Sequence, residues 1–112
     1  MKHRTYKTEP IKETPHKVDV RALYNDETAQ VMHIKLQAGE SLKPHLTPVD
    51  VVFYILEGNP TVHVGEESQV FEKDTLVESP ADIKHYLSNE SDAVARILVV
   101  KAPRPLAQAK LL

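Results

Sequence analysis

Histidines carry most of the metal-binding and acid–base chemistry that this sequence could support. The chain has six histidines and no cysteine, so a metal ion would have to be held by imidazole, carboxylate or hydroxyl groups. His45 and His85 stand on either side of a block of short apolar segments between Gly39 and Asn89. Imidazole also titrates near neutral pH, so this pair could transfer protons as well as bind metal.

His33 is the third histidine that the pattern singles out. In residues 30–37, Met32, Ile34 and Leu36 fall on one face of a predicted strand, which we expect to be core, and His33 falls on the other. His33 therefore remains a candidate ligand or pocket residue, with a structural role as the alternative. We expect the remaining histidines to be ordinary surface residues: His3, His16 and His63.

Short strands would have to position these side chains. Residues 50–57 are almost entirely apolar, are rich in β-branched and aromatic side chains, and end at Gly58-Asn59-Pro60, which predicts a strand closed by a tight turn. Further strands are predicted over residues 18–24, 30–37, 61–64, 69–72, 75–78, 83–88 and 94–101. Strands this short, separated by polar turns, indicate an antiparallel sandwich or barrel.

The length of 112 residues predicts one domain with irregular ends. Residues 1–17 contain Pro10 and Pro15 among charged residues and predict an extended N-terminal arm. The barrel is predicted over residues 18–102, and residues 103–112 form a short C-terminal tail. The tail has good helix formers but is too short for a stable isolated helix, so it must pack on the barrel or fray.

Charge and hydropathy exclude several partners. The formal net charge of −2 gives no reason to expect binding to nucleic acid or to an anionic membrane. No segment approaches the ~20 apolar residues of a membrane span, and the polar start lacks the apolar core of a secretory signal, so we expect a cytoplasmic protein. The arm is basic while residues 50–78 are acidic; these are either two solvated faces or a basic arm of one subunit lying on the barrel of another.

Two segments resemble the motifs of the cupin superfamily. The first family motif is Gly-x5-His-x-His-x3-Glu-x6-Gly, and this chain has Gly39, His45, Thr47, Val51 and Gly58 at those positions. The spacing is kept, while threonine and valine replace the second histidine and the glutamate. The resemblance implies an all-β fold, the double-stranded β-helix or jelly-roll cupin barrel.

The second family motif, Pro-x-Gly-x2-His-x3-Asn, is matched by Pro80, His85 and Asn89, while Asp82 replaces the glycine. In the family, a metal is usually held by the histidines and glutamate of the first motif and the histidine of the second. The resemblance therefore implies a divalent metal ion of unknown identity at His45 and His85.

The third ligand of such a metal is missing from the first motif. Thr47 offers only a neutral hydroxyl and Val51 offers no donor atom, whereas the usual sites use three or four protein ligands. Asp50 would face away from the barrel if position 51 faces inward, because side chains alternate along a strand. His33 is then the remaining candidate third ligand.

Two functions from different classes follow. In the first, the barrel binds a small molecule in an apolar pocket, alone or with a divalent metal held by the two histidines; if a reaction occurs, histidine acid–base catalysis fits better than oxygen activation. In the second, the barrel is a metal-free module that senses a ligand or serves as a dimeric scaffold. The expected pocket residues are Thr47, Val51, Phe53, Ile55 and Leu36, with Val62 and Val64.

A homodimer is expected under either function. Val52, Tyr54 and Leu56 would make the outer face of the central strand apolar. An apolar outer face has to be covered, and a second subunit is the simplest cover.

Overall fold

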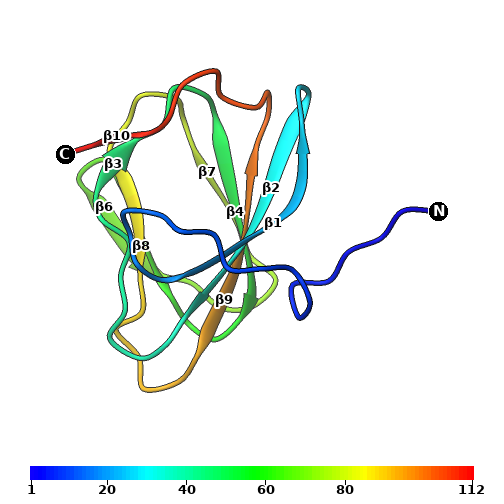
Figure 1. Ribbon diagram of the computed structural model, residues 1–112. Coiled ribbons are helices and arrows are strands. Elements are labelled where there is room, and N and C mark those ends of the chain that lie inside the picture. Colours follow the sequence, from blue (N-terminus) through cyan, green and yellow to red (C-terminus); the bar gives the residue numbers. More distant parts are fainter.

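The computed structural model describes all 112 residues, which form β-strands and no helix. The predicted all-β fold is therefore confirmed, and no helix of the chain could span a membrane. The strands, drawn in Figure 1, are β1 (Asp19–Asp26), β2 (Ala29–Leu36), β3 (His45–Leu46), β4 (Val51–Glu57), β5 (Thr61–Val64), β6 (Glu67–Val70), β7 (Leu76–Ser79), β8 (His85–Ser88), β9 (Ala95–Lys101) and β10 (Lys110–Leu111).

The strands form two five-stranded antiparallel sheets that face each other. One sheet has the order β1-β2-β9-β4-β7 and the other has the order β10-β3-β8-β5-β6. Strands far apart in the sequence are neighbours in both sheets, as in β2 beside β9 and β3 beside β8. This arrangement is the double-stranded β-helix expected from the two motifs.

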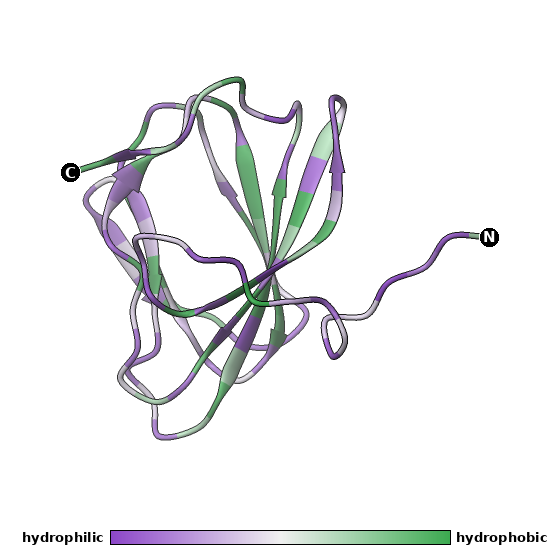
Figure 2. Cartoon of the chain, in the orientation of Figure 1, coloured by the Kyte–Doolittle hydropathy of each residue, from purple (hydrophilic) through white to green (hydrophobic).

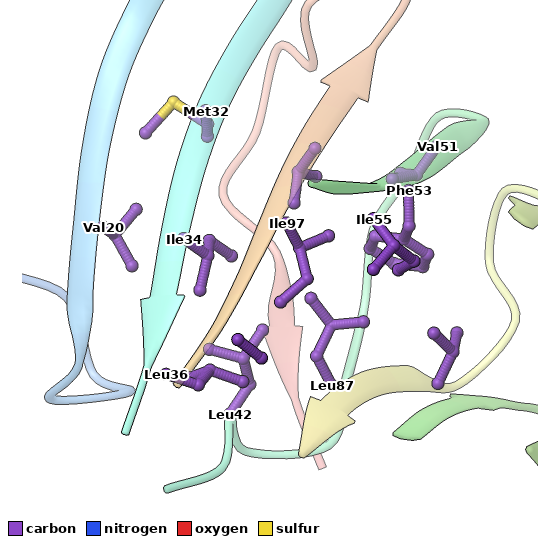
Figure 3. Close-up of a cluster of buried hydrophobic side chains, with 13 residues drawn as sticks. Val20, Met32, Ile34, Leu36, Leu42, Val51, Phe53, Ile55, Leu87 and Ile97 are labelled. Carbon is purple, nitrogen blue, oxygen red and sulfur yellow. The ribbon is translucent and has the colours of Figure 1, made fainter. Parts of the chain in front are cut away.

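The core lies between the sheets. Burial alternates along β4 and β9, because one face of each sheet contacts the other sheet and the opposite face is turned outward. The outer side chains of β4 are also mostly apolar, so this strand is hydrophobic along most of its length (Figure 2). Figure 3 shows side chains from β1, β2, β4, β8 and β9 pointing toward one another. The thirteen buried core residues are Val20, Met32, Ile34, Leu36, Leu42, Val51, Phe53, Ile55, Val62, Leu87, Ala95, Ile97 and Val99.

Both terminal segments pack on the barrel. The N-terminal segment crosses the front of the barrel in Figure 1 and is fixed by the Lys12 backbone N–H, which donates to the Val20 carbonyl at 2.7 Å. At the other end, β10 adds to the edge of the second sheet by pairing with β3. Of the two outcomes expected for the tail, packing and fraying, the structure shows packing, and the tail packs as a short strand because the edge of β3 offers it backbone hydrogen bonds.

Residues of the two motifs fix the loops around β3 and β8. Asp82, at the motif's glycine position, has a φ of 61°, a conformation that aspartate tolerates better than most residues. The buried Asn89 donates from its side-chain amide to the carbonyls of Leu36 and Ala93, at 3.0 and 2.7 Å. The backbone N–H of Asn89 donates to the Glu40 carbonyl, and its backbone carbonyl accepts from the Gly39 N–H. The second motif therefore holds the start of the first.

Candidate ligand-binding site

Strand register brings His45 and His85 together. The two residues are direct partners in the pairing of β3 with β8, so their side chains lie on the same face of the sheet. Their ring centroids are 4.7 Å apart with the rings tilted by 72°. The pair that motif spacing singled out is therefore one local cluster inside the barrel.

His85 is fixed by two buried hydroxyl groups. Its Nε2 lies 3.0 Å from Thr47 Oγ1, and its Nδ1 lies 2.6 Å from Ser79 Oγ. All three side chains are buried. Since a neutral imidazole has one donor and one acceptor nitrogen, one hydroxyl accepts from His85 while the other donates to it. Both ring nitrogens are thus already used within the protein.

One ring nitrogen of His45 has no hydrogen-bond partner. The other is hydrogen-bonded to the backbone of Lys43, which is in turn hydrogen-bonded to His16. His45 Nδ1 lies 2.7 Å from the Lys43 carbonyl oxygen, which can only accept, so Nδ1 carries the hydrogen and Nε2 is left as an acceptor. The Lys43 N–H donates to His16 Nδ1 at 2.9 Å, so a neutral His16 carries its hydrogen on Nε2. The rings of His16 and His45 are 4.9 Å apart.

A cavity of about 420 Å³ opens beside these histidines between the two sheets. Its apolar wall includes Met32, Val51 and Phe53, and the arm and the tail contribute His16 and Ala109 to its mouth. The volume falls within the roughly 300–1,000 Å³ typical of small-molecule sites. The cavity therefore combines apolar walls with a few polar groups.

Burial keeps the cavity histidines neutral at pH 7. It lowers the pKa of His16 and of His85 to about 4, with a further contribution in each case from the neighbouring His45. Burial also lowers the pKa of His45, partly opposed by the hydrogen bond to the Lys43 carbonyl. The Lys101 ammonium group acts in the same direction on all three rings. The histidines are hence neutral hydrogen-bonding groups at pH 7.

Residues 32–101 match the family model described as "Cupin domain". This chain belongs to the cupin family. It is 32% identical to the protein TT1209 from Thermus thermophilus, with a TM-score of 0.80 over 94% of this chain and 100% of that one. The uncharacterised protein MJ0764 from Methanocaldococcus jannaschii is 30% identical over 87 residues, which cover 77% of this chain and 75% of MJ0764.

The solved structure of MJ0764 is described as an RmlC-like cupin with a double-stranded β-helix fold. It matches this cupin with a TM-score of 0.74 over 88% of this chain and 92% of that one. The polyketide cyclase RemF from Streptomyces resistomycificus has a TM-score of 0.85 over 100% of this chain and 85% of its own, at 14% identity, and shares the fold alone.

The structure separates His33 from the cavity. Met32 and Ile34 face the cavity from β2, so His33 faces the outer side of the sheet. There its Nε2 accepts a hydrogen bond from Arg96 at 3.0 Å, and its ring stacks on Tyr6 at 4.0 Å. His33 cannot share a metal with His45 and His85, because the sheet lies between them.

The expected pocket residues divide into two groups. Val51 and Phe53 line the cavity, whereas Leu36 and Ile55 are fully buried in the core outside it. Thr47 lies beside His85 and does not line the cavity. Val62 belongs to the buried core and Val64 packs against it, but neither lines the cavity.

The side chains around His45 do not fit a divalent metal ion. Only His45 has an imidazole nitrogen with a free lone pair there, because Nδ1 of His16 accepts from the Lys43 N–H and both nitrogens of His85 are hydrogen-bonded to hydroxyl groups. Asp50 lies at the surface, where its carboxylate accepts from the Ala81 N–H at 2.8 Å. No group of three or more His, Cys, Asp or Glu side chains is placed to hold a metal. The nearby Lys101 ammonium would also repel a cation.

Two histidine or lysine side chains that line the cavity, His16 and Lys101, were not among the residues expected there from the sequence. A signal for Lys101 was present, because Ala95, Ile97 and Val99 face the core and period-2 alternation carries the same face on to position 101. His16 gave no such signal. It was expected at the surface, but the arm folds back on the barrel and places it beside His45.

Proposed function

We propose that this cupin binds a small molecule in the cavity between its sheets. One observation carries the proposal: a single cavity of about 420 Å³ has both an apolar wall and the free Nε2 of His45 in its lining. Apolar walls supply affinity and a few fixed polar groups supply orientation, as in most small-molecule sites. If the bound molecule reacts, His45 Nε2 is the group available to accept a proton.

The test is a fragment screen followed by NMR on the protein with labelled methyl groups. We expect binding fragments to shift the methyl signals of Met32 and Val51, which line the cavity. Ala109→Trp should narrow the mouth and weaken binding at least tenfold, whereas Ala93→Trp, in an exposed loop away from the cavity, should leave it unchanged. Failure of every fragment to shift the cavity methyls would contradict the proposal.

Metal content tests the alternative form of this function, in which His45 and His85 hold a divalent ion. Because the donor set does not fit, we expect protein purified without chelators to contain much less than one equivalent of nickel, zinc, manganese, copper or iron. Near-stoichiometric metal that disappears in both His45→Ala and His85→Ala would contradict this expectation.

A second candidate function is a metal-free scaffold that acts as a homodimer. It is favoured by a row of apolar side chains on the outer face of the first sheet, where Val52 pairs with Val100 and Tyr54 pairs with Leu98. These four side chains are only partly buried by the chain itself. The mass in solution, measured for the wild type and for Leu98→Glu, tests this function; a wild-type monomer would exclude it.

A further inference from the structure

Lys101 places a charged group in the wall of the cavity. It follows Ala95, Ile97 and Val99 on the inward face of β9 and lines the cavity. In the two neighbouring strands it pairs with Gln30 and Val51, neither of which is charged. None of the four ion pairs of the protein includes Lys101. Its ammonium group therefore faces the cavity without a carboxylate partner.

The interior of the cavity carries one uncompensated positive charge near neutral pH. The three cavity histidines are neutral there, because their pKa values are lowered. Lys12 and Glu13 also line the cavity, are exposed to solvent and have opposite charges. Of the two, only Lys12 acts on Lys101, and its positive charge adds to the repulsion there. A partly buried cation without a counterion is unfavourable, and an anion that enters the cavity would relieve this cost.

The hydrogen-bonding groups also suit an anion. Lys101 and the Nε2–H of neutral His16 are donors, and both side chains line the same cavity. A carboxylate is an acceptor with two oxygens, and hydrogen bonds between charged partners are stronger than neutral ones. The apolar side chains of Met32, Val51 and Phe53 can then contact the rest of the molecule. His45 Nε2 remains free to accept from a hydroxyl group.

We propose that the ligand is a small monocarboxylate with an apolar body, and that its carboxylate pairs with Lys101. One interior cation matches one negative charge, whereas a dianion would leave a charge uncompensated in an apolar cavity. This inference rests on the proposed function and specifies the chemical class of the ligand.

Matched acids and amides test the inference. Benzoate and hexanoate are compared with benzamide and hexanamide, which have nearly the same shape without the charge, and with phthalate as a dianion. Dissociation constants come from methyl NMR titrations at pH 7. We expect each monocarboxylate to bind wild-type protein at least roughly tenfold more tightly than its amide, the size expected for a charge-assisted contact. Phthalate should bind more weakly than benzoate.

Two variants separate Lys101 from general surface charge. Lys101→Met and Lys101→Gln should both remove the preference for the acid, and the amide should then bind at least as well. Lys35→Met removes a lysine from the outer face of β2 and should leave the preference intact. A two-dimensional ¹H–¹⁵N spectrum shows whether each variant is folded. The acid-against-amide comparison in the wild type does not depend on any variant.

The outcomes distinguish the two proposals. If acids and amides shift the cavity methyl signals with equal affinity, the monocarboxylate inference is overturned while small-molecule binding stands. An acid preference that persists in a folded Lys101 variant would likewise remove Lys101 as the anchor. If no compound of either kind shifts those signals, both proposals fail for these ligands, and the result favours the scaffold function.

Discussion

At the scale of single residues, Lys101 should limit the stability of the protein. Its pKa is lowered by burial and then by repulsion from Lys12. Lys101→Met removes the partly buried charge and keeps the length of the side chain, so we expect the free energy of unfolding to rise on the order of 1 kcal/mol at pH 7. Urea denaturation measures it, with Lys35→Met as the control.

The stability that Lys101→Met gains over the wild type should decrease as the pH rises. The folded protein releases the Lys101 proton at a lower pH than the unfolded chain does. As pH rises toward the unfolded value near 10.5, the unfolded state holds more protons and the wild type becomes relatively more stable. The advantage of the variant should therefore shrink as the pH rises toward 10.5. An advantage that grows with pH would contradict this account.

Residues of the site differ in how far the sequence could predict them. His45 and His85 followed from motif spacing, and strand register explains why that spacing brings them together. Lys101 could have been predicted by extending the alternation of β9 by one step. His16 could not, because its position depends on how a proline-containing arm packs, and the Lys43 peptide that holds it lies 27 residues away.

At the scale of elements, the turn between β4 and β5 should tolerate only glycine at position 58. Gly58 has a φ of 79°, and a Cβ there would lie 2.3 Å from the Val94 carbonyl oxygen and 2.9 Å from Ala95 Cα. Both contacts are with backbone, which cannot move aside cheaply. Gly39 has a similar φ of 84° but open space around it.

The comparison of these two glycines separates a steric clash from backbone strain. Gly39→Ala should lower the free energy of unfolding by about 1 kcal/mol, because alanine is strained in the left-handed conformation. Gly58→Ala should lower the free energy of unfolding by about 2 kcal/mol more than Gly39→Ala does, which is the usual cost of overpacking a core. Thermal or urea denaturation measures both variants. Equal losses would show that the approach of Val94 is not limiting.

The N-terminal arm should be held to the barrel by Tyr6. Its ring stacks on His33, and the Arg96 guanidinium lies 4.8 Å from the ring centroid. Burial lowers the pKa of His33 to about 4. Tyr6→Ala would expose His33, so the pKa should move back toward 6.5 while roughly 1 kcal/mol of stability is lost. An NMR titration of His33 measures the shift.

Tyr24→Ala is the control for Tyr6→Ala, because Tyr24 is an exposed tyrosine on β1. It should leave the titration of His33 unchanged. An unaltered His33 pKa in Tyr6→Ala would mean that the arm does not bury the ring. The sequence could predict the arm but not this contact, since His33 and Tyr6 lie in different elements and show no shared pattern.

At the scale of the whole molecule, the fold could be predicted more fully than the site. Period-2 alternation and turn residues define a strand wherever it lies, so eight of the ten strands overlap segments predicted from local patterns, whereas the two-residue strands β3 and β10 do not. The cavity depends instead on which segments close the barrel. The two terminal segments do so through a few backbone pairs, such as those of β10 with β3, and short irregular chains carry no periodic signal for such pairs.

Histidine burial should make the whole protein sensitive to acid. The pKa values of His16, His33 and His85 are lowered to about 4, mainly by burial, and burial also lowers those of His45 and His63. Between pH 6.5 and 4 the unfolded chain binds protons that the folded protein does not, so stability falls as pH falls. Each such group contributes a slope of about 1.4 kcal/mol per pH unit.

Urea denaturation at pH 7.5, 6.5, 5.5 and 4.5 measures this loss, and two variants assign it. His85→Gln can still bond Thr47 and Ser79 but does not titrate, so its stability should fall less steeply, by about one proton. His3→Gln, in the exposed start of the arm, should follow the wild type.

Carboxylates titrate equally in all three proteins and cancel in the comparison. A slope in His85→Gln equal to that of the wild type would show that His85 is protonated in the folded barrel, which would place a second positive charge beside Lys101.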